Sequence, residues 1–135
     1  MNQASRPISK LMIVDDNDVD QLVYRRMIEQ SERVDEILSF HYASDALDYL
    51  KAHNGEGVDV ILLDINMPRM NGFEFLDAAT ELFGNDFTIV IVMLTSSINP
   101  KDSKRARTYP VVRDYLGKPL TDDHLERIVE LLQSL

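Results

Sequence analysis

Apolar residues in this chain follow two patterns, one typical of buried strands and one typical of amphipathic helices. Residues 60–63 and 89–94 are apolar throughout. Continuous runs of this length are typical of parallel strands that helices cover on both faces. Near the end of the chain, apolar residues instead recur at about every third or fourth position: Leu125, Ile128, Val129, Leu132 and Leu135. This spacing predicts a helix with one apolar face.

The same patterns, with turn and cap residues, divide the whole chain into alternating strands and helices. The predicted strands cover residues 11–15, 35–40, 59–63, 88–94 and 111–116. Five helices follow them: residues 18–31, a helix capped by Ser44, one from Phe73 to Phe83, one from Asn99-Pro100 to Tyr109-Pro110, and one capped by Thr121. Five strand–helix units predict a doubly wound α/β sheet.

The first predicted helix is the most detailed of these expectations. Asn17 or Asp18 is its predicted N-cap, because both side chains accept hydrogen bonds from free helix N–H groups. Its apolar face is expected to include Leu22, Met27 and Ile28.

Polar residues follow four of the predicted strands. Asp15 and Asp16 end the first, Asp64 the third and Thr95 the fourth, while Lys118 follows the fifth. In a doubly wound sheet, ligands bind beyond the carboxyl ends of the strands. We therefore expect three carboxylates, a hydroxyl and an ammonium to share one shallow pocket.

The three acids predict a divalent metal site. Two carboxylates about 4 Å apart repel by roughly 4 kcal/mol at an effective dielectric constant near 20. Mg²⁺ prefers oxygen ligands and keeps part of its water shell, so Asp15, Asp16 and Asp64 suit Mg²⁺ (or Mn²⁺). The backbone carbonyl of Asn66 is a further candidate ligand. The alternative for the acid pair is that Asp15 and Asp16 only cap the first helix.

A phosphoryl group on Asp64 would meet the metal ion on one side and Lys118 and Thr95 on the others. Phosphoryl transfer needs positioning and charge neutralisation above all. A carboxylate nucleophile that forms an aspartyl phosphate is established chemistry. Alone, Lys118 is better explained as a solvated loop lysine and Thr95 as a turn residue. Beside the acids, they indicate a phosphoryl-accepting site.

From about Lys10 to its end, the chain resembles the receiver domain of two-component response regulators. The family has an acid pair after the first strand, a phospho-accepting aspartate after the third, Ser or Thr after the fourth and Lys-Pro after the fifth. Those positions hold Asp15-Asp16, Asp64, Thr95 and Lys118-Pro119.

The resemblance extends to the loops and implies a fold. Met67-Pro68 and Gly72 match the loop beyond the acceptor, and Tyr115 matches a switch aromatic. The resemblance implies a receiver domain over residues 10–135, after an N-terminal extension of residues 1–9. Its parallel sheet would have five strands in the order 2-1-3-4-5 between five helices, a flavodoxin-like three-layer sandwich.

The resemblance also implies roles at the site. Asp64 would be the phospho-acceptor. Asp16, Asp64 and the Asn66 carbonyl would bind magnesium directly, while Asp15 would help through water. The Lys118-Pro119 peptide bond is cis in the family.

Signalling would follow from two movements. Thr95 would shift toward the phosphoryl group and Tyr115 would rotate inward, although simple packing explains a half-buried Tyr115 equally well. A histidine kinase or a histidine phosphotransfer protein would be the donor, and an unknown protein partner or phosphorelay would receive the signal. The chain would catalyse only its own phosphorylation and dephosphorylation. Because it stops after the last predicted helix, we expect a stand-alone receiver, and a homodimer stays open.

Two departures from the family limit what carries over. Tyr109-Pro110-Val111-Val112 stands where many receivers have a Gly-Ala pair, so dimer contacts do not transfer. Asn66 and Ser97 occupy positions that influence the lifetime of the phosphoryl group in the family. That lifetime is therefore not predicted.

Composition narrows the function classes. Fourteen basic against twenty-three acidic residues give a net charge of −9, which repels a phosphate backbone. The chain has no cysteine, which excludes disulfides and thiolate metal sites. It has neither a signal-peptide pattern nor an apolar run near the roughly 20 residues of a membrane span. We therefore expect a cytoplasmic protein that binds neither membranes nor nucleic acid directly.

Three other functions fit the sequence less well. A magnesium-dependent phosphohydrolase of the haloacid-dehalogenase kind would need a second acid where Asn66 stands, for general acid–base work. A flavodoxin-like cofactor binder would need a phosphate loop after the first strand, where this chain has two aspartates. No Gly-x-x-x-x-Gly-Lys-Ser/Thr motif supports a nucleotide site.

Overall fold

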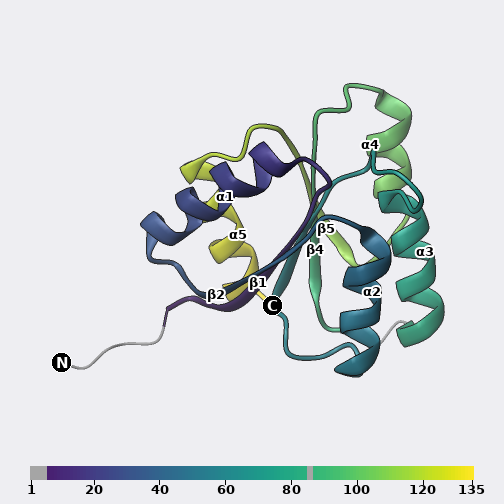
Figure 1. The fold of residues 1–135 in the computed structure, drawn as a ribbon, viewed down its shortest axis with the longest axis horizontal. Coiled ribbons are helices and arrows are strands. Elements are labelled where there is room, and N and C mark those ends of the chain that lie inside the picture. Colours follow the sequence, from purple (N-terminus) through teal and green to yellow (C-terminus); the bar gives the residue numbers. More distant parts are fainter. Residues whose placement is uncertain (1–5, 85–86) are drawn as a thin grey trace.

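The computed structural model describes residues 6–84 and 87–135, and its helices lie on both faces of one parallel sheet (Figure 1). The sheet order is β2-β1-β3-β4-β5, and every neighbouring pair is parallel. The strands are β1 (Ile8–Val14), β2 (Val34–Phe40), β3 (Val60–Leu63), β4 (Val90–Thr95) and β5 (Val112–Gly117). The predicted doubly wound sheet and its strand order are confirmed.

The five predicted helices are also present. They are α1 (Asp18–Ser31), α2 (Ala43–Ala52), α3 (Gly72–Phe83), α4 (Pro100–Ala106) and α5 (Asp122–Gln133). Figure 1 shows α1 and α5 on one face of the sheet and α2, α3 and α4 on the other. Among the described residues, no helix combines the length and apolar character of a membrane span.

Each strand of the sheet's centre contributes to two separate cores. Met12 of β1 packs with the α2–α3 side, whereas its neighbours Leu11 and Ile13 pack with the α1–α5 side. Ile61 and Leu62 of β3 divide in the same way. Successive side chains of a strand point to opposite faces. A central strand with both faces covered must therefore be apolar at every position, which is the pattern in the sequence.

Side-chain caps fix where several helices begin. Asn17, not Asp18, caps α1: its side chain accepts a hydrogen bond from the Asp20 N–H at 2.9 Å. Thr121 caps α5 as predicted, and Pro100 occupies the first turn of α4 after its cap Asn99. These bonds satisfy N–H groups that have no partner within the helix.

Five local predictions were wrong. Ser44 does not cap α2, because the helix already begins at the buried Ala43 and its N-cap is Tyr42. The strand β1 begins at Ile8, three residues earlier than predicted. Leu22 is 52% exposed, because the inward face of α1 is set by Gln21, Tyr24 and Ile28.

The other two wrong predictions concern the ends of α4 and α5. α4 stops at Ala106, three residues before the predicted Tyr109-Pro110 stop, because turn-type hydrogen bonds continue from there to Tyr109. Leu135 lies beyond the end of α5 and is 63% exposed, so it is not part of the helix's apolar face. Of the predicted N-terminal extension, residues 1–5 lie outside the described part of the chain.

Candidate functional site

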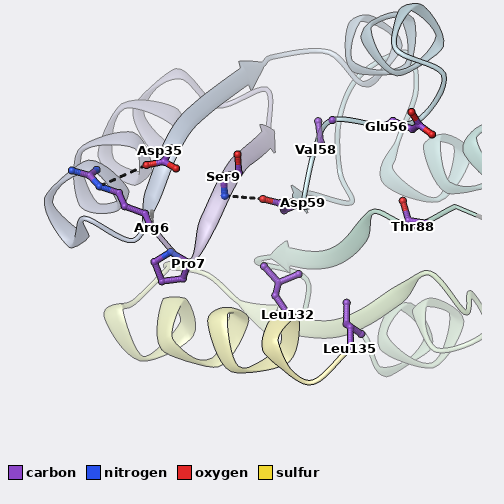
Figure 2. A pocket seen from close by; sticks show the side chains of 11 residues that line it. Arg6, Pro7, Ser9, Asp35, Glu56, Val58, Asp59, Thr88, Leu132 and Leu135 are labelled. Atoms are coloured by element: carbon purple, nitrogen blue, oxygen red, sulfur yellow. Dashed lines mark hydrogen bonds and ion pairs between the residues drawn. The ribbon is translucent and has the colours of Figure 1, made fainter. Parts of the chain in front are cut away.

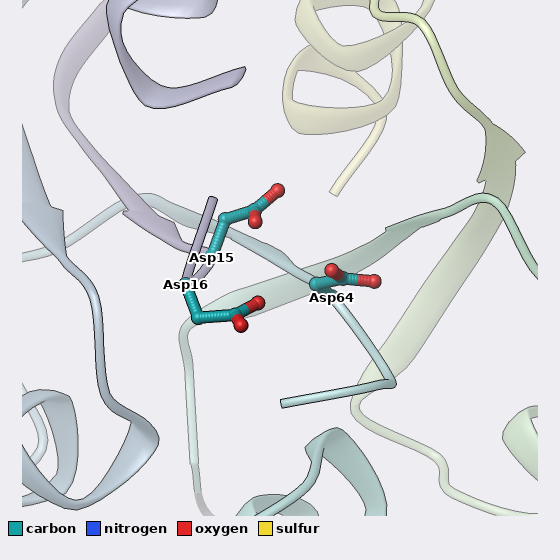
Figure 3. Close-up of side chains that lie close together, drawn as sticks. All are labelled: Asp15, Asp16 and Asp64. Atoms are coloured by element: carbon teal, nitrogen blue, oxygen red, sulfur yellow. The ribbon is translucent and has the colours of Figure 1, made fainter. Parts of the chain in front are cut away.

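The three predicted acids meet at the carboxyl ends of β1 and β3. Val14 pairs with Leu63 across these strands, and the Asp64 N–H donates to the Val14 carbonyl at 3.0 Å. This register sets Asp15 and Asp64 side by side. One carboxylate oxygen each of Asp15, Asp16 and Asp64 lies within 4.8 Å of the others (Figure 3). Asp15 and Asp64 are buried, whereas Asp16 is exposed.

Lys118 reaches into this cluster from the loop after β5. Its Nζ lies 2.7 Å from Asp15 Oδ2, 2.8 Å from Asp20 Oδ2 and 3.2 Å from Asp64 Oδ2. Burial by itself lowers the pKa of Lys118, but hydrogen bonds to Asp15 and Asp20 and the charge of Asp64 raise it above its usual range. Lys118 is therefore charged and neutralises part of the acid cluster.

Burial acts on the pKa of the Asp15 carboxyl in the opposite direction. Burial raises the pKa of the Asp15 carboxyl, while Lys118 and the Asn17 N–H, which donates to Asp15 Oδ1 at 2.9 Å, counteract this rise. Asp64 Oδ1 accepts a hydrogen bond from its neighbour's backbone, the Ile65 N–H, at 2.8 Å. Asp64 Oδ2 is the oxygen that faces Lys118.

Gly72 allows the loop after β3 to fold back on Asp64. Its N–H donates to the Ile65 carbonyl at 2.8 Å, and a Cβ at this position would collide with the backbone carbonyl oxygen of Asp64. A residue without a side chain is needed where two backbone segments come this close. Gly72 thus brings the start of α3 against the acid cluster.

A shallow pocket of about 450 Å³ lies over the cluster. Its lining includes Asp16, Asp20, Asp64, Asn66, Ser96 and Lys118. The structure therefore brings four of the predicted site residues to one pocket, and Asp15 lies beneath them against Lys118. Asn66 is exposed at the rim.

Neither Thr95 nor Tyr115 lines this pocket. Thr95 is 1% exposed; its Oγ1 accepts from the Ser97 N–H at 3.1 Å, and its carbonyl accepts from the Lys118 N–H at 2.9 Å. The hydroxyl of Tyr115 is buried and has no hydrogen-bond partner among the described residues. Burial also raises the pKa of this phenol. The Lys118-Pro119 bond is cis.

Two residues of α1 that the sequence did not indicate belong to this region. Asp20 contacts Lys118, and the buried Gln21 donates from Nε2 to the carbonyls of Asp15 at 3.0 Å and Phe40 at 2.9 Å. Gln21 thereby fixes the first turn of α1 to the ends of β1 and β2. No sequence pattern marked Asp20, because its contact with Lys118 joins segments 98 residues apart.

The family follows from a comparison with known proteins. The model of the response regulator receiver domain matches residues 11–130. This chain belongs to that family. The probable methanogenesis regulatory protein FilR2 of Methanothrix harundinacea is 32% identical over 127 residues, which are 92% of this chain and 81% of that protein.

Other relatives of the receiver are much longer. Hybrid signal transduction histidine kinase B of Dictyostelium discoideum is 28% identical over 137 residues, which cover 93% of this chain but 7% of the kinase. A two-component response regulator of Arabidopsis thaliana, ARR13, is 29% identical over 96% of this chain and 22% of its own length. The same domain thus occurs in proteins of very different size.

Solved structures share the fold closely. A two component response regulator from Cytophaga hutchinsonii has a TM-score of 0.84 at 29% identity, covering 96% of this chain and all of that one. A response regulator receiver protein from Dyadobacter fermentans has a TM-score of 0.81 at 28% identity, over 93% of this chain and 98% of that one. The chain is therefore a response regulator receiver by both sequence and fold.

Proposed function

We propose that Asp64 accepts a phosphoryl group from a phosphohistidine donor in a reaction that requires a divalent metal ion. One observation carries this proposal: a carboxylate oxygen of Asp64 lies within 4.8 Å of those of Asp15 and Asp16, and the Lys118 ammonium contacts Asp64 at 3.2 Å. A nucleophilic carboxylate that joins a cation site to a fixed positive charge suits phosphoryl transfer, because that reaction depends on positioning and neutralisation.

In the transfer, an Asp64 carboxylate oxygen attacks phosphorus and the phosphorus–nitrogen bond of the donor breaks. The electron pair stays with that nitrogen, and the proton already present on the other ring nitrogen makes the leaving group neutral histidine. Asp64 Oδ1 is held by the Ile65 N–H, so Oδ2, which faces Lys118, is the oxygen we assign as the nucleophile. Lys118 would neutralise the phosphoryl oxygens as the new bond forms.

The acid cluster fits the metal that such a reaction needs. Asp16 and Asp64, with Asp15 through water and the carbonyl of Asn66, would hold Mg²⁺ or Mn²⁺ by oxygen ligands alone. A bound ion would polarise the phosphoryl oxygens and lower the repulsion among the acids. A neighbour in fold, the response regulator Rcp1, was solved in a Mn²⁺-bound form, with a TM-score of 0.71 at 24% identity over 94% of this chain and 93% of that one.

The response would pass from Asp64 toward the β4–β5 side. Thr95 is linked to the Lys118 backbone and lies one strand away from Asp64, so its hydroxyl would turn toward a phosphoryl group there. Tyr115 would then change position, because its buried hydroxyl has no partner to hold it among the described residues. A cytoplasmic histidine kinase or phosphotransfer protein would be the donor, and a protein partner would read the change.

Mass spectrometry tests the acceptor. With acetyl phosphate and MgCl₂, we expect the native protein to gain one phosphoryl group and Asp64→Asn to gain none. Asp59→Asn is the matched control, since it makes the same change at the opposite edge of the sheet and should label as the native protein does. Normal labelling of Asp64→Asn would reject the assignment.

A further inference from the structure

Asp20 makes a contact at the site that none of the receiver motifs in this chain includes. It lies in the first turn of α1, and its Oδ2 accepts a hydrogen bond from Lys118 Nζ at 2.8 Å. An ammonium group has three N–H donors. Lys118 has three carboxylate partners, Asp15, Asp20 and Asp64, so its donors are fully used.

Of these three contacts, the one to Asp64 is the longest. Lys118 Nζ lies 3.2 Å from Asp64, against 2.8 Å from Asp20 and 2.7 Å from Asp15. For Lys118 to bind a phosphoryl oxygen, one of these hydrogen bonds must be given up. Asp20 is the partner that stands outside the cluster of three acids that suits a metal ion. Its contact is the one that a metal ion would leave in place.

The backbone of Asp20 is held firmly enough for this contact to persist. Its N–H donates to the side chain of the N-cap Asn17 at 2.9 Å. The next residue, Gln21, is buried and bonded to the carbonyls of Asp15 and Phe40. The Asp20 carboxylate therefore stays beside the pocket, which it lines.

We propose that Asp20 is a positioning residue that occupies one N–H donor of the Lys118 ammonium in the unphosphorylated protein, keeps that donor from an incoming phosphoryl group and thereby slows phosphorylation of Asp64. This inference rests on the proposed function. Two effects act in the same direction. The Asp20 carboxylate competes for the donors of Lys118, and its negative charge repels an anionic phosphoryl donor that enters the pocket.

The test is the rate of phosphorylation by acetyl phosphate at saturating MgCl₂. We expect Asp20→Asn, which keeps the shape but removes the charge, to react about three- to tenfold faster than the native protein, the range of a contact between neighbouring groups. Asp20→Glu, which restores the charge, should stay within about twofold of the native rate. An Asp20→Asn rate equal to or below the native rate would overturn the proposal.

Glu29→Gln is the matched control. It removes the same charge from the same helix, but Glu29 is exposed, lies nine residues beyond Asp20 and does not line the pocket. We expect its rate to stay within about twofold of the native rate, because exposed charges interact weakly. Equal acceleration by Glu29→Gln would show an effect of net charge, and would also overturn the proposal.

A second measurement does not depend on phosphorylation. The ¹H–¹⁵N signal of the Lys118 ammonium, protected from exchange by its three carboxylate partners, should weaken in Asp20→Asn and persist in Glu29→Gln. An unchanged signal in Asp20→Asn would contradict the contact. If the native protein showed this signal but Asp64 gained no phosphoryl group, the proposed function would be rejected. The contact between Lys118 and Asp20 would still be supported.

Discussion

Acidic residues lie at both the amino edge and the carboxyl edge of the sheet, where the strands begin and end. The partners of these acids differ between the two edges. The amino edge has the larger pocket, about 920 Å³, and two of its acids, Asp35 and Asp59, have partners close by (Figure 2). Asp59 accepts hydrogen bonds from the Ser9 and Lys10 N–H groups at 2.7 and 3.1 Å, and Arg6 lies 3.9 Å from Asp35. These contacts hold the start of β1 in the sheet.

The carboxyl edge is shallower, about 450 Å³, yet its acids face one another. Asp15, Asp16 and Asp64 converge, and a single ammonium, that of Lys118, neutralises part of their charge. Like charges this close are costly unless a ligand or a cation compensates for them. The candidate functional edge is therefore distinguished by three converging acids that share one ammonium, and not by the size of its pocket.

The largest effect on this contrast should come from Lys118→Ala. Removing the ammonium leaves the buried Asp15 without its partner, so we expect a loss of about 3 kcal/mol in the free energy of unfolding without divalent ions. Urea unfolding measures it, and saturating MgCl₂ should recover part of the loss. Lys104→Ala, at an exposed position on α4, should change the value by less than about 0.5 kcal/mol. An unchanged free energy of unfolding for Lys118→Ala would mean that repulsion among the acids does not destabilise the carboxyl edge.

The metal site gives the next effect. Asp16→Asn removes a carboxylate from the acid cluster, so we expect the dissociation constant of Mg²⁺, measured by calorimetry, to rise at least about tenfold. Asp35→Asn makes the same change at the amino edge and should leave Mg²⁺ binding as it is. If both substitutions raised the dissociation constant of Mg²⁺ equally, the metal site would not be specific to the carboxyl edge.

Asp59→Asn probes the amino edge directly. The amide keeps an acceptor but loses the charge that two backbone N–H groups share, so we expect the free energy of unfolding to fall by about 1 kcal/mol. Phosphorylation by acetyl phosphate should proceed at the native rate. A large drop in that rate without a loss of stability would link the amino edge to the chemistry.

Tyr109→Phe should have the smallest effect. Its hydroxyl donates to Asp77 at 2.6 Å, so we expect a loss of about 0.5–1 kcal/mol in unfolding free energy. Burial, and then the hydrogen bond and charge of Asp77, raise the pKa of the Tyr109 phenol. The unfolded chain therefore ionises first, and native stability falls as the pH rises past about 10. Unfolding followed between pH 8 and 11 should show a shallower fall for Tyr109→Phe, and equal slopes would contradict it.

Most of the fold and the acid cluster could be predicted from the sequence because both follow from short-range patterns. Apolar runs identify the central strands, and parallel strands must end at a common edge. Asp15 and Asp64 therefore meet without any knowledge of side-chain packing. The contact between Asp64 and Lys118 needed only the further step that β5 joins the same sheet.

What the sequence did not predict depends on how helices sit on the sheet. Asp20 meets Lys118 only because Gln21 fixes the rotation of α1 against β1 and β2. The same rotation turns Leu22 outward, although its residue type suggested the core. Rotations of this kind arise from packing between distant segments, and periodicity alone leaves them undetermined within one helical face.

The most direct test is to locate the phosphoryl group on the native protein. After reaction with acetyl phosphate and MgCl₂, borohydride reduces an aspartyl phosphate to homoserine, which peptide mass spectrometry can place in the chain. We predict homoserine at position 64 and at none of the other aspartates. Homoserine at position 15, 16 or 59, or a phosphoryl group that resists reduction, would contradict Asp64 as the acceptor.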